Sequence, residues 1–320
     1  MDELSRPRVG VLYGGISSER EVSLDSGEAV GAGLREAGYP VELIDIREVP
    51  LCELTLERMD VAFIALHGTF GEDGGIQAVL DALGVPYTGS GVEASRLAMD
   101  KVAAKERFRG SCVPTPAYAE LDAEWPEARK LRAARSLGFP VVLKPAREGS
   151  SLGVAIAYAE QELAEAVARP FEFDHRALAE QYIDGRELTV GILDDTPLPT
   201  IELVYDGGSF TYDIKYTHGA AKHVVNPELP PGVAERVQAA ALAAHQCLGC
   251  RGCTRVDIRL GRDGVPYVLE VNTVPGMTGV SLLPDAARAA GLRFPELCDH
   301  AVRLAVGTGA PTPARITVEA

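Results

Sequence analysis

The chain has 320 residues, of which 46% are hydrophobic, and this is typical of a globular protein built from two or three packed units. Its 31 basic and 46 acidic side chains give a formal net charge of −15, which argues against general affinity for nucleic acids or anionic membranes. No apolar run approaches the roughly 20 residues that span a bilayer. Residues 1–7 lack the features of a signal peptide, so we expect a cytoplasmic protein without nucleic-acid or membrane partners.

The first 100 residues alternate strand and helix patterns. Strands are expected where short apolar runs occur, at 8–13, 41–46 and 60–66. Between the first two, Ser18 and Glu21 form a capping box that starts a helix through about Ala37. This alternation predicts a doubly wound α/β unit over residues 1–100.

The rest of the chain combines helices with strands that are joined by tight turns. Helices are expected near residues 100, 124–137, 160–168 and 233–248, and strands at 140–144, 154–158, 177–183, 187–193 and in a hairpin over 254–272. A type I′ turn at Asp184-Gly185 would pair two of these strands and place Glu180, Tyr182 and Glu187 on one face. Hairpins that follow an α/β unit predict two α+β subdomains, at 101–184 and 185–320.

Three of the six cysteines form a C-x-x-C-x-x-C run, at Cys247, Cys250 and Cys253, with His245 just upstream. One interpretation is a zinc or iron–sulfur site. The other is a set of reduced, mostly buried thiols. We favour the second, because ligands on the end of a helix, a turn and a strand would have to fold back onto one point.

The predicted hairpin carries two facing acids. Its strands alternate polar and apolar residues, and the Asp-Gly pair at 263–264 favours a type I′ turn. In that register Asp257 faces Glu270, and Arg255 faces Asn272. A turn at 262–263 would change the opposite pairs but leave all four residues on one face. Adjacent carboxylates repel each other unless a cation lies between them, and an oxygen-only set of Asp, Glu and Asn suits Mg²⁺ or Mn²⁺. The pattern predicts a hard divalent metal; the alternative is a solvated sheet face on which acids lie by chance.

A glycine- and serine-rich loop between two expected strands, at 149–153, is suited to covering phosphates with its N–H groups. Lys144, at the end of the preceding apolar strand, supplies a positive charge. The loop is not a G-x-x-x-x-G-K-[ST] phosphate loop, and no G-x-G-x-x-G follows the first strand, where Gly14-Gly15 stands instead.

Taken together, these segments resemble the D-alanine–D-alanine ligase family of the ATP-grasp superfamily. The resemblance rests on an ordered set of motifs from near the N-terminus to about residue 291. The matching segments are 14–23, 65–68, 71–74, 87–91, 99–101, 144–153, 213–216, 255–257 and 270–277. It implies an ATP-grasp fold, in which an N-terminal α/β unit is followed by two α+β subdomains.

The resemblance also implies a role for each matched position. The residues implied for ATP are Lys101, Lys144, Ser151, Glu180, Ile183, Glu187 and Lys215. Those implied for two Mg²⁺ ions, with Mn²⁺ as an alternative, are Asp257, Glu270 and Asn272. Those implied for the first D-alanine are Glu19 and His67, and for the carboxylate of the second, Ser281 and Leu282. Arg255 and the N–H of Gly276 would stabilise the oxyanion, while Tyr216 and Ser150 would link to Glu19 and close a loop over the site.

The implied reaction is ATP-dependent ligation of two D-alanines through an acyl phosphate, by a homodimer. Three alternatives differ in class: a related ligase with another second substrate, a nicotinamide oxidoreductase, and a catalytically silent nucleotide-binding module. Gln181 and Tyr182 depart from the family pattern beside the adenine, and Gly279-Val280 departs from it beside the second substrate. These departures bear on nucleotide affinity and on substrate selectivity more than on reaction type.

Overall fold

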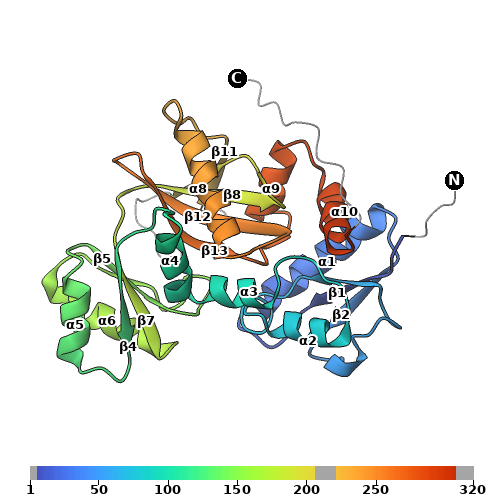
Figure 1. The fold of residues 1–320 in the computed structure, drawn as a ribbon, viewed down its shortest axis with the longest axis horizontal. Coiled ribbons are helices and arrows are strands. Elements are labelled where there is room, and N and C mark those ends of the chain that lie inside the picture. The colour runs from blue at the N-terminus through green and yellow to red at the C-terminus, as the bar shows by residue number, and fades with distance from the viewer. Residues whose placement is uncertain (1–5, 206–220, 308–320) are drawn as a thin grey trace.

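The computed structural model describes residues 6–205 and 221–307, which are arranged around three β-sheets (Figure 1). The first sheet lies at one end of the molecule, the second at the other end, and the third between and above them. In these two described stretches, no helix is both long enough and apolar enough to cross a membrane.

The first sheet is parallel, with strand order β2-β1-β3, and it confirms the predicted α/β unit. Its strands are β1 (Val9–Tyr13), β2 (Val41–Asp45) and β3 (Val61–Ile64). Its helices and short 3₁₀ turn are α1 (Arg20–Glu36), η1 (Leu51–Glu53) and α2 (Gly75–Leu83). Strand β1 is apolar along its whole length because α1 covers one face of the sheet and α2 the other.

The predicted Ser18–Glu21 capping box is wrong. Helix α1 begins at Arg20 with Glu19 as its N-cap residue, and no side chain caps it. The Ser17 hydroxyl instead donates to the His67 carbonyl at 2.6 Å, so this loop is held by tertiary contacts and not by a local box.

Two helices, α3 (Val92–Met99) and α4 (Lys101–Gly110), lead to the second sheet, which is antiparallel in the order β4-β7-β5-β6. Its strands are β4 (Tyr118–Asp122), β5 (Val141–Pro145), β6 (Ala155–Ala157) and β7 (Arg176–Gln181). One face packs on α5 (Glu127–Arg135) and α6 (Leu163–Ala168), which the short turns η2 (Glu160–Glu162) and η3 (Arg169–Glu172) flank.

The third sheet has six strands, in the order β11-β10-β8-β12-β13 with β9 paired to β8. Its strands are β8 (Gly185–Leu193), β9 (Thr196–Pro197), β10 (Ile201–Tyr205), β11 (Ala221–Val225), β12 (Cys253–Gly261) and β13 (Pro266–Asn272). Helix α8 (Val233–Cys247) packs on one face. Helix α9 (Leu282–Ala289) packs against β8 and β11 of the third sheet, and α10 (Phe294–Ala305) returns to the first sheet, where it lies along α1 (Figure 1).

The predicted type I′ turn at Asp184-Gly185 is wrong. Strands β7 and β8 do not pair; they belong to the second and third sheets, and residues 182–184 connect the two. Gly185 is needed for a different reason, because a Cβ at this position would overlap the Leu260 carbonyl oxygen of the neighbouring strand.

The hairpin of β12 and β13 has the predicted pairs but not the predicted turn. Arg255 faces Asn272, and Asp257 faces Glu270. The turn has three residues, 262–264, between Gly261 N and Val265 O, which are 3.0 Å apart. A bulge beside Asp257 adds one residue on the opposite strand and restores the predicted register.

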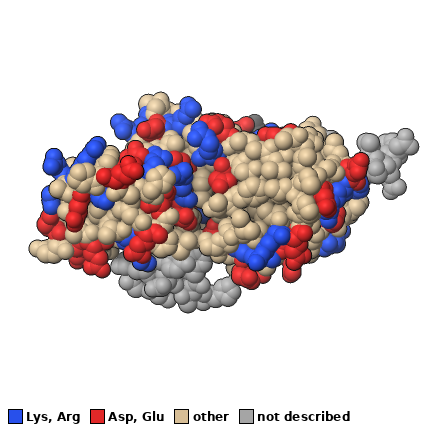
Figure 2. Space-filling view, turned by 90° about the horizontal axis from the view of Figure 1, so that it is seen from below, with Lys and Arg blue, Asp and Glu red and all other residues tan. Residues whose placement is uncertain are grey.

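Charged side chains of both signs are mixed on the face shown in Figure 2. They are dense over the end that holds the second sheet, whereas a broad area over the other end carries few of them. Lysine and arginine form no continuous basic area on this face.

Candidate active site

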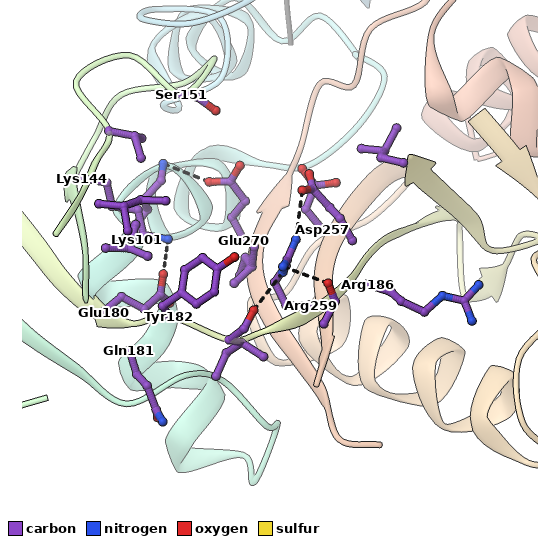
Figure 3. Close-up of a pocket in the computed structure, with 18 of the residues that line it drawn as sticks. Lys101, Lys144, Ser151, Glu180, Gln181, Tyr182, Arg186, Asp257, Arg259 and Glu270 are labelled. Carbon is purple, nitrogen blue, oxygen red and sulfur yellow. Dashed lines mark hydrogen bonds and ion pairs between the residues drawn. The ribbon is translucent and has the colours of Figure 1, made fainter. Parts of the chain in front are cut away.

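A cavity of about 350 Å³ lies between the second and third sheets (Figure 3). Both sheets and the 182–184 connection line it. Its lining includes eight of the residues predicted for nucleotide or metal: Lys101, Lys144, Ser151, Glu180, Ile183, Glu187, Asp257 and Glu270. Residues that are far apart in the sequence are therefore brought to one place.

A buried carboxylate between two lysines forms one wall. Glu180 is 2% exposed and makes ion pairs with Lys144 and with Lys105, which donates to the Thr115 hydroxyl at 2.7 Å. Burial opposes ionisation of Glu180, but the two ammonium groups outweigh it and hold the pKa of this carboxyl below its usual value. Burial also lowers the pKa of Lys105 to about 8.

Sequence reasoning missed Lys105. The available signal was its spacing, because it follows Lys101 by four residues and so lies on the same side of helix α4. Nothing local showed that it would be completely buried beside Glu180.

Lys101 lies at the first turn of α4, where the Asp100 carboxylate caps the helix by accepting from Val102 N and Ala103 N at 3.1 Å each. Its Nζ is 3.1 Å from Glu270 and donates to the Glu148 carbonyl at 2.7 Å. Lys101 therefore links the base of the glycine- and serine-rich loop to the hairpin of β12 and β13.

The two facing acids of the hairpin each have a cationic neighbour. Asp257 accepts from Arg255 Nε and Nη2 at 2.9 and 2.8 Å and from the Thr189 hydroxyl at 2.9 Å, while Glu270 pairs with Lys101. Burial opposes the charge of Arg255, but Asp257 more than offsets this and raises the pKa of the guanidinium.

The third predicted ligand, Asn272, is placed differently from the two acids. Its side-chain oxygen accepts from Val274 N at 2.9 Å. It is on the same hairpin but is not among the residues that line the cavity. Within residues 6–205 and 221–307, no three His, Cys, Asp or Glu side chains are grouped so as to hold a metal.

The glycine- and serine-rich loop lies over Glu19 of the first unit. The Ser150 hydroxyl donates to the Glu19 carboxylate, and a Cβ at Gly149 would come within 3.2 Å of Glu19 Oε2. Ser150 and Ser151 have φ values of 53° and 57°, in the left-handed region that serine seldom adopts. Such strain is frequent in ligand-binding loops.

One serine, Ser26, connects His67 with the loop that carries Gly276, which is predicted to stabilise the oxyanion. His67 Nε2 is 3.1 Å from the Ser26 hydroxyl, which accepts from Met277 N at 3.3 Å, and His67 Nδ1 is 3.2 Å from Glu72. Ser26 on helix α1 thus connects the first unit to the loop that carries Gly276.

Gly276 lies directly against Ser281, because a Cβ at Gly276 would be 2.8 Å from Ser281 Oγ. Ser281 is the N-cap residue of α9, which begins at Leu282. The Ser281 hydroxyl accepts from Thr278 N at 3.0 Å. The positions predicted for the oxyanion and for the second substrate are therefore neighbours.

Two predicted positions, Lys215 and Tyr216, lie outside the described residues. In Figure 3 the Gln181 side chain points away from the group formed by Lys144, Glu180 and Tyr182. The Tyr182 ring lies beside Lys144 and Glu180, so of these two departures from the family pattern Tyr182 is the one nearer to the residues predicted for the nucleotide.

The cysteine run lies on three different elements, with Cys247 at the end of α8, Cys250 in the turn and Cys253 at the start of β12. Burial raises the pKa of the Cys250 and Cys253 thiols to about 12, which makes them poor metal ligands and nucleophiles. All three cysteines of the run are partly buried, whereas Cys52 and Cys112, which are not part of it, are exposed.

Comparison with known proteins identifies the fold and its family. A family model described as "D-ala D-ala ligase C-terminus" matches residues 108–303, and one described as "D-ala D-ala ligase N-terminus" matches residues 51–90. A D-alanine–D-alanine ligase from Desulforudis audaxviator is 46% identical over 93% of this chain and 98% of its own, and one from Bordetella avium is 45% identical over 91% and 92%.

Solved structures agree with these relatives. The crystal structure of a D-alanine–D-alanine ligase from Bacillus anthracis matches with a TM-score of 0.84 and 40% identity, covering 94% of this chain and 98% of its own. A structure of the ligase from the same organism complexed with ATP matches with a TM-score of 0.81 and 36% identity, over 94% and 98% of the two chains. The chain therefore has the ATP-grasp fold and belongs to the D-alanine–D-alanine ligase family.

Proposed function

We propose that the protein joins two D-alanines into D-alanyl-D-alanine, a building block of peptidoglycan, and converts ATP to ADP and phosphate. The observation that carries the proposal is the continuity of two sites. The cavity with Lys101, Lys144 and the acids of the hairpin meets, at the glycine- and serine-rich loop, the Glu19–Ser150 contact of the first unit.

ATP is proposed to lie in the cavity between the second and third sheets. Glu180 and the backbone near Ile183 would hold the adenine, Glu187 the ribose, and Lys101, Lys144 and Ser151 the phosphates. Lys215 completes the proposed phosphate contacts. The lysines neutralise charge on the phosphates, and this is what phosphoryl transfer chiefly requires.

Asp257, Glu270 and Asn272 are proposed to hold two Mg²⁺ ions, with Mn²⁺ as a substitute. The donor set fits: two carboxylates face each other at one end of the hairpin, an amide oxygen lies two pairs further along, and all are hard oxygen donors. When bound, the ions would neutralise negative charge on the phosphates during phosphoryl transfer.

The reaction requires activation of a carboxylate, because a carboxylate is a poor electrophile. The γ-phosphoryl group passes to the carboxylate of the first D-alanine, whose ammonium Glu19 would bind with His67 nearby. The amine of the second D-alanine then attacks the carbonyl carbon, and phosphate leaves. Ser281 and the N-terminus of α9 at Leu282 would bind the carboxylate of this second substrate.

Arg255 and the N–H of Gly276 would stabilise the oxyanion during that attack. Asp257 binds Nε and Nη2 of Arg255, which fixes the plane of the guanidinium and directs Nη1 away from Asp257. The acyl phosphate must be protected from water, and Ser150, together with Tyr216, would serve by holding the loop closed over Glu19.

Three further proposals concern the whole chain. The division into units of residues 1–100, 101–184 and 185–320 is supported by the three separate sheets. A homodimer and a cytoplasmic location are supported by the family resemblance alone.

The decisive experiment is incubation with Mg-ATP and D-alanine, with mass detection of the dipeptide and a coupled assay for ADP. Equal amounts of D-alanyl-D-alanine and ADP are expected. A parallel panel of D-lactate and other D-amino acids as second substrates tests for a related ligase. Preference for any of them over D-alanine would overturn the proposed specificity, and absence of ADP release would overturn the activity itself.

A further inference from the structure

Arg259 reaches from β12 onto the backbone that connects the second and third sheets. Its Nε donates to the Ile183 carbonyl at 3.2 Å, and its Nη2 donates to the Gly185 carbonyl at 3.0 Å. Its Nη1 donates to the Glu187 carboxylate at 3.4 Å, and Glu187 faces Arg259 across the paired strands. A single guanidinium thus contacts two carbonyls and one carboxylate on the wall of the cavity (Figure 3).

The contacts of Arg259 are partly shielded from solvent. Its side chain is 17% exposed and that of Glu187 is 11% exposed. The guanidinium carbon lies 5.9 Å from the centre of the Tyr182 ring, which belongs to the same connection. Charged hydrogen bonds in such surroundings are stronger than those on an open surface.

The connection at residues 182–184 is part of neither sheet. Strand pairing therefore does not place it, although its backbone and the adjoining Glu187 are where the proposed nucleoside contacts are made. Arginine is suited to fixing it, because a planar fork reaches several acceptors at once and a lysine ammonium does not.

We propose that Arg259 is a positioning residue for the nucleoside end of ATP, an inference that rests on the proposed function. It holds the carbonyl of Ile183 and the carboxylate of Glu187 in one arrangement before the nucleotide binds. Less ordering is then required on binding, which raises affinity. The role concerns adenosine and not the phosphates.

The test compares three variants by calorimetric titration with Mg-ATP, Mg-ADP and tripolyphosphate. Arg259→Met keeps the apolar stem and removes every donor; about a tenfold weaker affinity is expected, equally for ATP and ADP, with little change for tripolyphosphate. Arg259→Lys should be intermediate. Arg262→Met is the matched control, because Arg262 pairs with Asp184 of the same connection at 2.8 Å but is 82% exposed.

Steady-state kinetics supply the second readout. In Arg259→Met the KM for ATP should rise, while kcat and the KM for D-alanine stay within about twofold of wild type. A merely structural role would lower the melting temperature without separating the KM for ATP from kcat. If Arg259→Met does not fold, as judged by circular dichroism, Arg259→Lys decides the question.

The two proposals fail in distinguishable ways. If the wild type binds neither ATP nor ADP, the proposed function is overturned. If the wild type binds both and the Arg259 variants bind equally tightly, only the positioning role is overturned. It is also overturned if ATP affinity falls much more than ADP affinity, or if Arg262→Met weakens binding as strongly as Arg259→Met.

Discussion

The buried ammonium of Lys105 makes folding stability depend on pH, and Lys105→Met should remove that dependence. Burial lowers the pKa of Lys105 from 10.5 to about 8 in the folded protein. Between these values the unfolded chain binds more protons than the folded chain, so the free energy of unfolding rises with pH. At 1.36 kcal/mol per pKa unit, Lys105 contributes a rise of about 2 kcal/mol from about pH 7.5 to about 9.5.

Urea denaturation of wild type and variant at several pH values in that range measures this term. The difference in unfolding free energy should shift in favour of the wild type by about 2 kcal/mol as pH increases. In the variant Glu180 remains paired with Lys144. Any change in unfolding free energy from the lost Lys105–Glu180 pair is therefore expected to be the same at every pH in this range. Lys222→Met, which removes an exposed lysine from β11, controls for the loss of one lysine. A difference that stays constant across the range would refute the reasoning.

Three more predictions concern catalysis. Glu270→Gln should lower kcat/KM for ligation by about 100-fold because it weakens metal binding, and dipeptide formation near the normal rate would contradict the metal assignment. Ser150→Ala removes the hydroxyl that contacts Glu19 and should raise the KM for the first D-alanine about tenfold, with the KM for ATP unchanged; the opposite pattern would place Ser150 at the nucleotide. Chelation should abolish ADP release, and adding Mg²⁺ or Mn²⁺ should restore it. Atomic absorption should detect no zinc released from the protein. Recovery of activity with zinc alone would support a zinc site at the cysteine run.

Local sequence was enough to predict which residues face each other in the hairpin of β12 and β13. Alternation of polar and apolar residues in both strands predicted the pairs of Asp257 with Glu270 and of Arg255 with Asn272, and both pairs form. The predicted turn was nonetheless wrong. The longer turn shifts the pairing register by one residue, and the bulge shifts it back before Asp257 and Glu270. Alternation of polar and apolar residues predicts neither feature.

The Asp-Gly dipeptide misled the prediction at both places where it was used. At 263–264, the Asp263 carboxylate accepts from Val265 N at 3.0 Å and from the Tyr267 hydroxyl at 2.9 Å, which stabilises a longer turn. At 184–185, the flanking strands join different sheets. A dipeptide reports which backbone angles are accessible, but the partner of each strand is decided by packing far along the chain.

The residues that the sequence did not reveal owe their roles to contacts between distant segments. Arg259 lies 76 positions from Ile183, and its strand alternation marks it only as a polar residue on an exposed face. Lys105 was similarly indistinguishable from a surface lysine of a helix. The positions that the family resemblance supplied, such as Glu19 and Ser150, could not have been paired from composition or periodicity, because 131 positions separate them.

The return of α10 to the first sheet has a consequence for how the chain is made. The side chains of Leu297, Ala301 and Val302 share one core with Val9 and Leu34. A Cβ at Gly33 would lie 2.9 Å from Phe294 Cδ1, so the two helices are in close contact. The first unit is synthesised before α10, yet one side of its core is completed only by α10. An apolar surface on the first segment therefore stays uncovered until α10 has been made, and a chain cut before Phe294 would keep it uncovered permanently.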